Sequence, residues 1–318
     1  MRKLSYLEAI KESVVLNMKN NKNIIAYAEG SDPALGSFHK KSELVKEFGN
    51  ERIFDTPLSE AGMQGLGIGA AINGIRPIFV WFRIDFMLLG MDLIFNHAAK
   101  LKNIYNINCP IVIKTTIGRG WGQGPNHSQA FHSIFSHFPG VKVVLPSNAY
   151  DAKGLMNSAL KEQNPIIYIE HKSLFASTEF VPKKNYYVKI GKAKVKKRGK
   201  DITLVSFSSM VRECELADKY SEYDCEIIDM ISSYPLDVET VISSVKKTKR
   251  LIIVDVDWIF GGISAEIAAQ VYEKCKKILK KKIIRMGMPH NSVPTSWSLE
   301  KKIYPDYRKI INQIEKLI

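Results

Sequence analysis

The sequence predicts an α/β protein built from two domains. Apolar segments of about four to seven residues alternate with amphipathic stretches through most of the chain, which is the pattern of crossover units on a parallel sheet. The length of 318 residues corresponds to about two domains, at roughly 100 to 200 residues each. No apolar run approaches the roughly 18 residues of a membrane helix, and the first residues lack the apolar centre of a signal peptide. We therefore expect a cytoplasmic protein.

The first domain is predicted over residues 1–174. Short apolar runs predict its strands at 24–28, 77–82, 110–115, 141–145 and 166–170. Amphipathic stretches predict its helices near 4–20, 60–73, 87–104 and 148–161. These elements suit one doubly wound sheet.

A linker and a smaller α/β domain are predicted to follow. The periodicity lapses over 175–187, where prolines, lysines and aromatic residues take over. The second domain, residues 188–318, has predicted strands at 202–206, 225–229, 251–256 and 282–286. Its predicted helices lie near 209–221, 237–247, 261–277 and 306–317.

Composition argues against several functional classes. The 46 basic and 32 acidic residues give a net charge of +14. This excess is spread over both halves of the chain, whereas a nucleic-acid binder is expected to concentrate it on one face. The four cysteines form no CxxC pair and are too scattered for a disulfide framework or a zinc site, so we expect buried, reduced thiols.

A glycine-rich stretch at 65–70 matches the GxGxxA form of the dinucleotide fingerprint, but its context does not. The fingerprint requires a strand immediately before the glycines, and residues 55–60 read as a turn and a helix start with Ser59 as a candidate N-cap. The small side chains at 62, 65, 69 and 70 instead predict a helix face that can lie close to another backbone. Glu60 falls in the first turn, where the helix dipole favours a negative charge, so it could be an ordinary surface acid.

A second glycine-rich stretch, residues 118–129, follows a predicted strand and carries His127. Open α/β sheets bind ligands at the carboxyl ends of their strands. Histidines at 127, 132 and 137 recur every five residues, which suits neither one helix face nor a metal-binding pair. No nucleophile elbow or phosphate-binding P-loop is present.

Three stretches together resemble the beta subunit of the thiamine-diphosphate-dependent first component of 2-oxo acid dehydrogenases. They are 55–62 (Asp-Thr-Pro-Leu-Ser-Glu-Ala-Gly) running on to 74–77, 124–129 (Gly-Pro-Asn-His-Ser-Gln), and 139–144 with 151–155. Segments 191–193, 261–267 and 293–296 resemble the carboxyl-terminal domain of the same family, so the resemblance covers nearly the whole chain. It implies a transketolase-type pyrimidine-binding domain and a smaller transketolase carboxyl-terminal domain.

The resemblance also implies roles for individual residues. Glu60 would hydrogen-bond N1′ of the cofactor's pyrimidine and promote the imino tautomer that removes the thiazolium C2 proton. Leu58 would contact the cofactor, Phe86 would stack on the pyrimidine, and His127 would act near the substrate. From the residues alone, Phe86 could also be core packing and His127 a loop hydrogen-bonder. A potassium site of the family, built from backbone carbonyls and a carboxylate, maps onto Ile111, Ala159, Leu160, Glu162 and Asn164.

Two features bear on the reaction and the partners. Val80 stands where the family usually has an acid, and 101–106 lacks the usual arginine and serine-glycine elements, so a transketolase-like carboligase or aldehyde-transfer subunit in sugar metabolism is the alternative function. The sequence has no Gly-Asp-Gly with a downstream asparagine, the pattern that holds Mg²⁺ and diphosphate. The resemblance therefore implies an alpha subunit that carries the diphosphate-Mg²⁺ site in an α2β2 assembly, with a dihydrolipoyl acyltransferase core as a further partner.

Overall fold

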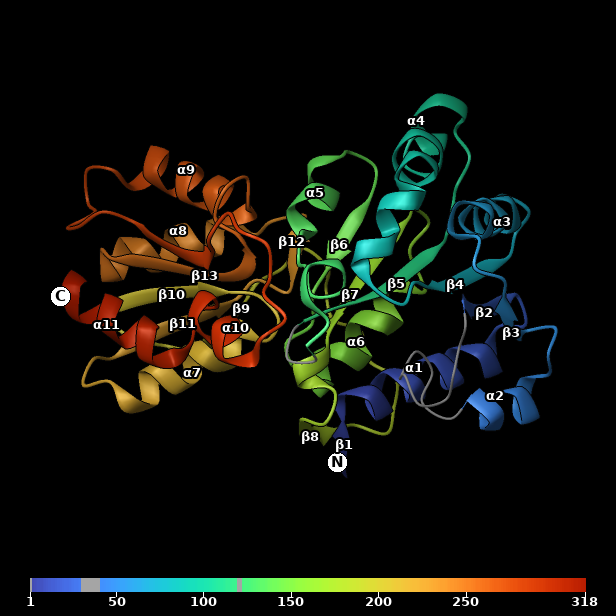
Figure 1. Ribbon diagram of the computed structural model, residues 1–318, viewed down its shortest axis with the longest axis horizontal. Coiled ribbons are helices and arrows are strands. Elements are labelled where there is room, and N and C mark those ends of the chain that lie inside the picture. Colours follow the sequence, from blue (N-terminus) through green and yellow to red (C-terminus); the bar gives the residue numbers. More distant parts are fainter. Residues whose placement is uncertain (1, 30–40, 119–121) are drawn as a thin grey trace. The chain divides into compact units, whose positions relative to one another are not determined.

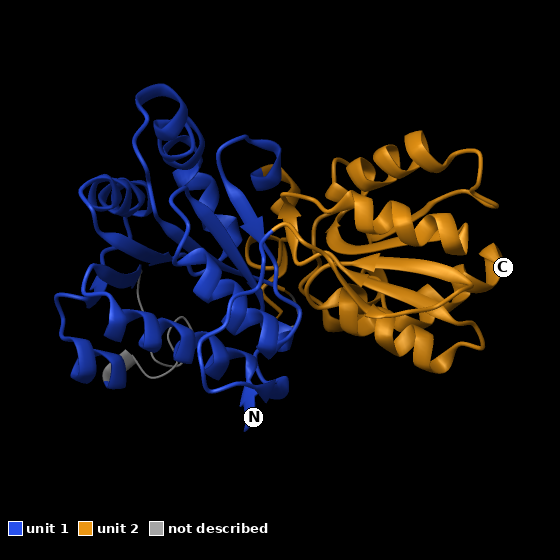
Figure 2. Ribbon diagram, turned by 180° about the vertical axis from the view of Figure 1, so that it is seen from behind, with its two compact units in different colours: residues 1–117, 135–190 blue, residues 118–134, 191–318 orange. Residues whose placement is uncertain are grey.

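The computed structural model describes residues 2–29, 41–118 and 122–318, without the side chains of Glu29, Lys41 and Ser42. The chain divides into two compact units, 1–117 with 135–190 and 118–134 with 191–318 (Figure 2). Residues 118–134 thus group with the second unit although they lie within the sequence of the first predicted domain.

The first unit is built on a parallel sheet with strand order β6-β7-β5-β4-β2-β3. The strands are β2 (Ile24–Glu29), β3 (Ile53–Thr56), β4 (Arg76–Val80), β5 (Val112–Ile117), β6 (Lys142–Val144) and β7 (Ile166–His171). Both faces of β7 are buried, which explains its nearly continuous apolar sequence. Every strand predicted for this domain is confirmed, and the structure adds β3.

Helices cover both faces of this sheet, with α1 and α6 on one side and α3 on the other (Figure 1). The helices of this unit are α1 (Tyr6–Asn20), α2 (Lys41–Phe48), α3 (Glu60–Ile72) and α6 (Ala149–Ala159), with the short 3₁₀ turn η5 (Lys172–Leu174). The 3₁₀ turn η4 (Gly124–Asn126) belongs to the second unit, and α5 (His132–His137) begins in that unit and ends in the first. Ser5 caps α1 through a reciprocal capping box with Glu8. The predicted linker contains β8 (Thr178–Val181), which pairs antiparallel with β1 (Arg2–Ser5).

The single helix expected over 87–104 is instead broken into three pieces. They are the 3₁₀ helix η2 (Ile84–Gly90), the π-helical η3 (Leu93–Ala98) and the short α4 (Leu101–Tyr105). Gly90 ends η2, and a Cβ there would meet the Trp81 ring at 2.8 Å. Close packing against that indole therefore requires glycine, which is a poor residue for continuing a helix.

The second unit has a smaller sheet with order β14-β13-β10-β11-β9, parallel except for β9. The strands of this sheet are β9 (Lys194–Lys197), β10 (Ile202–Ser206), β11 (Cys225–Asp229), β13 (Leu251–Trp258) and β14 (Ile284–Met288). The unit also contains the short strand β12 (Ser232–Tyr234), which is not part of this sheet. Helices α8 (Val238–Thr248) and α9 (Ile263–Cys275) cover one face, and α7 (Met210–Tyr220) and α11 (Tyr307–Leu317) the other (Figure 1). The short α10 (Trp297–Ile303) precedes α11. The α/β prediction is confirmed in both units.

Candidate active site

Glu60 is the first residue of α3, immediately after the turn that leaves β3. Its side chain is half-buried and forms no hydrogen bond or ion pair with the part of the chain that the structure describes. Ser59 occupies the N-cap position without a side-chain cap bond. The carboxylate therefore lies beside the partly positive helix start and is available to an outside group.

The glycines of the 65–70 stretch lie inside α3 and not in a strand-to-helix turn. β3 ends at Thr56, and a turn and the first turn of α3 separate it from Gly65, so no strand immediately precedes the glycines. The fingerprint also needs its glycines at the helix start, where backbone N–H groups face a phosphate.

Phe86 lies on η2, which packs against α3, the helix of Glu60. Gln64 of α3 also accepts a 3.1 Å hydrogen bond through its Oε1 from Nε1 of Trp81, which lies between β4 and η2. Phe86 is half-buried, whereas Leu58, in the turn before α3, is 81% exposed. The structure therefore brings Glu60 and Phe86 onto adjoining elements and leaves Leu58 as an exposed apolar side chain.

Two buried ion pairs near the carboxyl ends of the first sheet were missed by the sequence reasoning. Lys114 Nζ lies 2.8 Å from Glu170 Oε2, and both side chains are almost fully buried. Burial raises the pKa of Glu170, and the Lys114 charge opposes that rise. Arg83 Nε lies 3.4 Å from Asp85 Oδ2 in a second buried pair directly before Phe86. A charged residue inside an otherwise apolar strand was the available signal for Lys114.

His127 lies on the loop of the second unit, directly after η4. Residues 119–121 of the predicted glycine-rich loop lie outside the described residues. Gly124 has a φ of +64°, and a Cβ there would meet Thr295 Oγ1 at 2.5 Å, so a larger residue would displace the loop. Tyr304 donates a 3.2 Å hydrogen bond to the Ser128 carbonyl. These contacts fix the backbone on both sides of His127.

A buried histidine and two aspartates of β13 anchor the far end of the same loop. His132 Nε2 lies 3.0 Å from Asp255 Oδ2, and His132 Nδ1 lies 3.9 Å from Asp257 Oδ2. The Asp257 carboxylate also accepts a 3.1 Å hydrogen bond from the Ser133 amide. Burial alone would lower the pKa of His132, but the two carboxylate charges and the Asp255 hydrogen bond outweigh it and raise that pKa to about 9. His132 is therefore an imidazolium at neutral pH.

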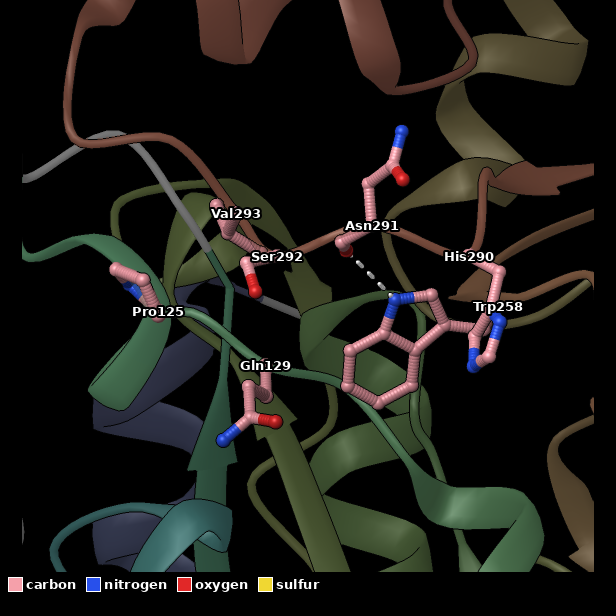
Figure 3. A pocket seen from close by; sticks show the side chains of 7 residues that line it. All are labelled: Pro125, Gln129, Trp258, His290, Asn291, Ser292 and Val293. Carbon is pink, nitrogen blue, oxygen red and sulfur yellow. Dashed lines mark hydrogen bonds between the residues drawn. The ribbon is translucent and has the colours of Figure 1, made fainter.

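A pocket of about 260 Å³ lies beside the His127 loop (Figure 3). It is lined by Pro125, Gln129, Trp258, His290, Asn291, Ser292 and Val293. Trp258 Nε1 donates a 3.1 Å hydrogen bond to the Asn291 carbonyl, and Phe131 stacks on the Trp258 indole. Gln129 and Ser292 lie on the side of the indole away from His290 (Figure 3). The pocket combines an aromatic wall with neutral hydrogen-bonding groups.

Backbone carbonyls of the predicted potassium site already have partners. Arg76 Nη1 donates to the Leu160 carbonyl at 3.0 Å and to the Glu162 carbonyl at 2.9 Å. The Ile111 carbonyl accepts the Ile166 amide at 3.0 Å, and the Ala159 carbonyl accepts the Glu162 amide at 3.2 Å. Asn164 is half-buried at the turn before β7. The positive groups at this corner are the Arg76 guanidinium and Lys142, whose Nζ lies 2.7 Å from Glu162 Oε2.

The described residues contain no cluster of three or more His, Cys, Asp or Glu side chains able to hold a metal. All four cysteines are buried, and burial raises the pKa of Cys109 and of Cys225 to about 12. Within the described part of the chain, no helix is both long enough and apolar enough to cross a membrane.

Comparisons with known proteins agree with this architecture. Residues 2–177 match the transketolase pyrimidine binding domain, and residues 191–310 match the transketolase C-terminal domain. A solved split-gene transketolase, described as an inactive beta4 tetramer, superposes with a TM-score of 0.79 over 99% of this chain and 98% of its own. Its sequence identity is 18%, so this likeness concerns the fold alone.

Curated relatives are similar over the full length. The beta subunit of acetoin:2,6-dichlorophenolindophenol oxidoreductase from Bacillus subtilis is 34% identical over 100% of this chain and 98% of its own. The corresponding subunit from Cupriavidus necator is 36% identical over 97% of this chain and 96% of its own. The pyruvate dehydrogenase E1 component subunit beta of Bacillus subtilis is 31% identical over 100% of this chain and 99% of its own.

These matches confirm the family predicted from the sequence motifs. The transketolase-type domains follow one another in the expected order, and the relatives are beta subunits of similar length. The chain belongs to the family of beta subunits of thiamine-diphosphate-dependent 2-oxo acid dehydrogenases.

Proposed function

We propose that this chain provides the pyrimidine side of a thiamine-diphosphate site, with Glu60 as its acid-base group. The observation that carries the proposal is the half-buried Glu60 carboxylate at the start of α3, which has no partner among the described residues. Such a carboxylate can share a proton with a ring nitrogen of a bound group. The apolar Leu58 side chain and the Phe86 ring suit a flat heteroaromatic ring beside it.

When bound, thiamine diphosphate supplies the carbanion chemistry of 2-oxo acid decarboxylation. In this proposal Glu60 would share a proton with the bound pyrimidine, and Phe86 would supply the aromatic side chain that holds it. His127 exchanges a proton with the substrate, from a loop whose backbone is fixed on both sides. The names of the relatives favour pyruvate or acetoin as the substrate.

Our assignment of domains and partners follows from the same reasoning. We assign pyrimidine binding to residues 1–174, a linker to 175–187 and the transketolase C-terminal-like domain to 188–318. Because the sequence lacks the diphosphate-Mg²⁺ motif, an alpha subunit would hold Mg²⁺ in an α2β2 assembly, and a dihydrolipoyl acyltransferase would accept the product. Exposed apolar side chains on the first unit support a partner surface there. They are Leu58, Leu66, Leu88 and Leu89.

Potassium has no role in this proposal, because carbonyl oxygens of its predicted site already accept hydrogen bonds from a positively charged side chain. Two of its carbonyls, those of Leu160 and Glu162, already accept hydrogen bonds from the Arg76 guanidinium. A potassium ion on the same oxygens would lie close to a fixed positive charge.

Titration calorimetry tests the proposed function directly. The purified chain alone should bind thiamine diphosphate weakly and show no turnover. Adding the alpha subunit from the same genome should produce Mg²⁺-dependent binding and conversion of pyruvate or acetoin. Tight Mg²⁺-dependent binding by the demonstrated monomer would contradict the proposal, and two-carbon transfer from a keto sugar phosphate would favour the transketolase-like alternative.

A further inference from the structure

A groove of about 500 Å³ lies on the second unit between α9 and the approach to β14, and we call it the α9 groove. Its lining residues are Ala268, Ala269, Tyr272, Lys276, Leu279, Lys281, Lys282 and Ile283. The floor is formed by the apolar side chains of Ala268, Leu279 and Ile283, which are half-buried and so remain partly accessible. Tyr272, which is 58% exposed, lines the side of the groove. The adjoining β14 is the edge strand of its sheet, with mostly half-buried residues.

A dense group of lysines surrounds the α9 groove. Between residues 274 and 285 the sequence contains no acidic residue. The Lys280 amide donates a 3.0 Å hydrogen bond to the Lys249 carbonyl, which brings the basic end of α8 beside this stretch. We define the lysine cluster as Lys246, Lys249, Lys274, Lys276, Lys277, Lys280, Lys281 and Lys282.

The lysines of the cluster are not engaged in ion pairs within the described chain. None of its members forms an ion pair with a described residue, although Glu239 and Glu273 lie on the neighbouring helices α8 and α9. Elsewhere in the same unit lysines are paired, as in Lys192 with Asp237 and Lys247 with Glu226. Crowded positive charges that repel one another favour an anionic partner.

We infer that the α9 groove is a docking surface for an acidic protein segment that inserts an apolar side chain. The lysine cluster would attract the carboxylates of the segment, and the floor would take one side chain of about the size of leucine. The edge of β14 lies beside the groove and suits an extended segment. This inference does not depend on the proposed thiamine site.

A nucleic acid fits the same surface less well. Phosphates would neutralise the lysines but would leave the apolar floor uncovered, and Tyr272 is the only aromatic side chain that lines the described groove. The floor therefore distinguishes a peptide from a polyanion that binds through charge alone.

Fluorescence anisotropy with two labelled peptides tests the inference. One probe is a twelve-residue peptide of Glu and Asp with a central Leu, and the other has Ala at that position. The groove variant is Lys281→Glu with Lys282→Glu, and the matched control is Lys196→Glu with Lys200→Glu, which makes the same charge change at exposed lysines of the same unit. A third variant, Ala269→Trp, fills the groove without changing charge.

We expect the wild-type chain to bind the Leu peptide at least about tenfold more tightly than the Ala peptide, the range for burying one such side chain. The groove variant should lose at least tenfold in affinity and the control less than threefold, while Ala269→Trp should abolish the preference for Leu. Equal losses in both charge variants, or equal binding of both peptides, would overturn the inference. Tighter binding of a DNA duplex or of phosphatidylserine vesicles, with the same dependence on Lys281 and Lys282, would show that the surface binds that partner and that the acidic peptide is the wrong occupant. Circular dichroism melting confirms that each variant is folded.

Discussion

Replacing His132 by Gln tests how the His127 loop is held on the second unit. The pKa of His132 rises from 6.5 to about 9, since Asp255 and Asp257 together outweigh the effect of burial. Such a rise corresponds to about 3 kcal/mol of stability. Because the folded-state pKa is raised, this stability is fully present below pH 6.5 and is lost as the pH rises through about 9.

Urea unfolding between pH 6.5 and 9.5 measures this contribution. We expect the free energy of unfolding of the wild-type chain to fall by about 3 kcal/mol more than that of His132→Gln over this range. Titration of ¹³C-labelled histidine by NMR gives an independent value, with the His132 signal assigned from its loss in the variant. Parallel pH dependences in the two proteins, or a His132 signal that titrates near 6.5, would refute the ion pair with Asp255.

Two further predictions concern charged side chains of the first unit. Exchanging KCl for choline chloride at constant ionic strength should leave the melting temperature of the wild type unchanged, and a potassium-dependent melting temperature would contradict the absence of a potassium site. Arg76→Met should destabilise the chain by about 1–3 kcal/mol, because two carbonyls lose their donor. Lys114→Met should lower the free energy of unfolding by about 3–5 kcal/mol, because it leaves Glu170 buried and unpaired. Adding Glu170→Leu should restore most of this free energy, measured by urea unfolding. A double variant as unstable as Lys114→Met would show that the ion pair itself stabilises the fold.

The order of elements could be predicted because each strand is a short apolar run. In β7 the apolar run 166–169 corresponds directly to burial on both faces of the strand. The prediction failed over 87–104, where helical periodicity continues through Gly90 but packing against Trp81 breaks the helix. The contact between Gly90 and Trp81 joins different elements, so it cannot be predicted from the local sequence pattern.

Residues of the candidate site were predictable only where a motif carried them. Glu60 at a helix start and His127 on a glycine-rich loop are both readable from the sequence. In the sequence His132 is one of three evenly spaced histidines, and its partners lie more than a hundred residues away on β13. The alternating acids at 255 and 257, inside an apolar strand, were the available signal. Residues 118–134 group with the second unit through such distant contacts, which cannot be predicted from the order of residues in the sequence.

The role of Glu60 is tested most directly by exchange of the C2 proton of thiamine diphosphate, followed by NMR in the assembled complex. Glu60→Gln keeps the size and hydrogen-bonding reach of the side chain but removes the carboxylate, and Glu51→Gln is the matched control at an exposed acid of the same unit. We expect Glu60→Gln to slow the exchange by about 100-fold or more, the range for a positioned acid or base, while the control exchanges like the wild type. If Glu60→Gln exchanges the proton as fast as the wild type in an intact, cofactor-loaded complex, Glu60 is a structural residue at the start of α3 and the proposed catalytic role is wrong.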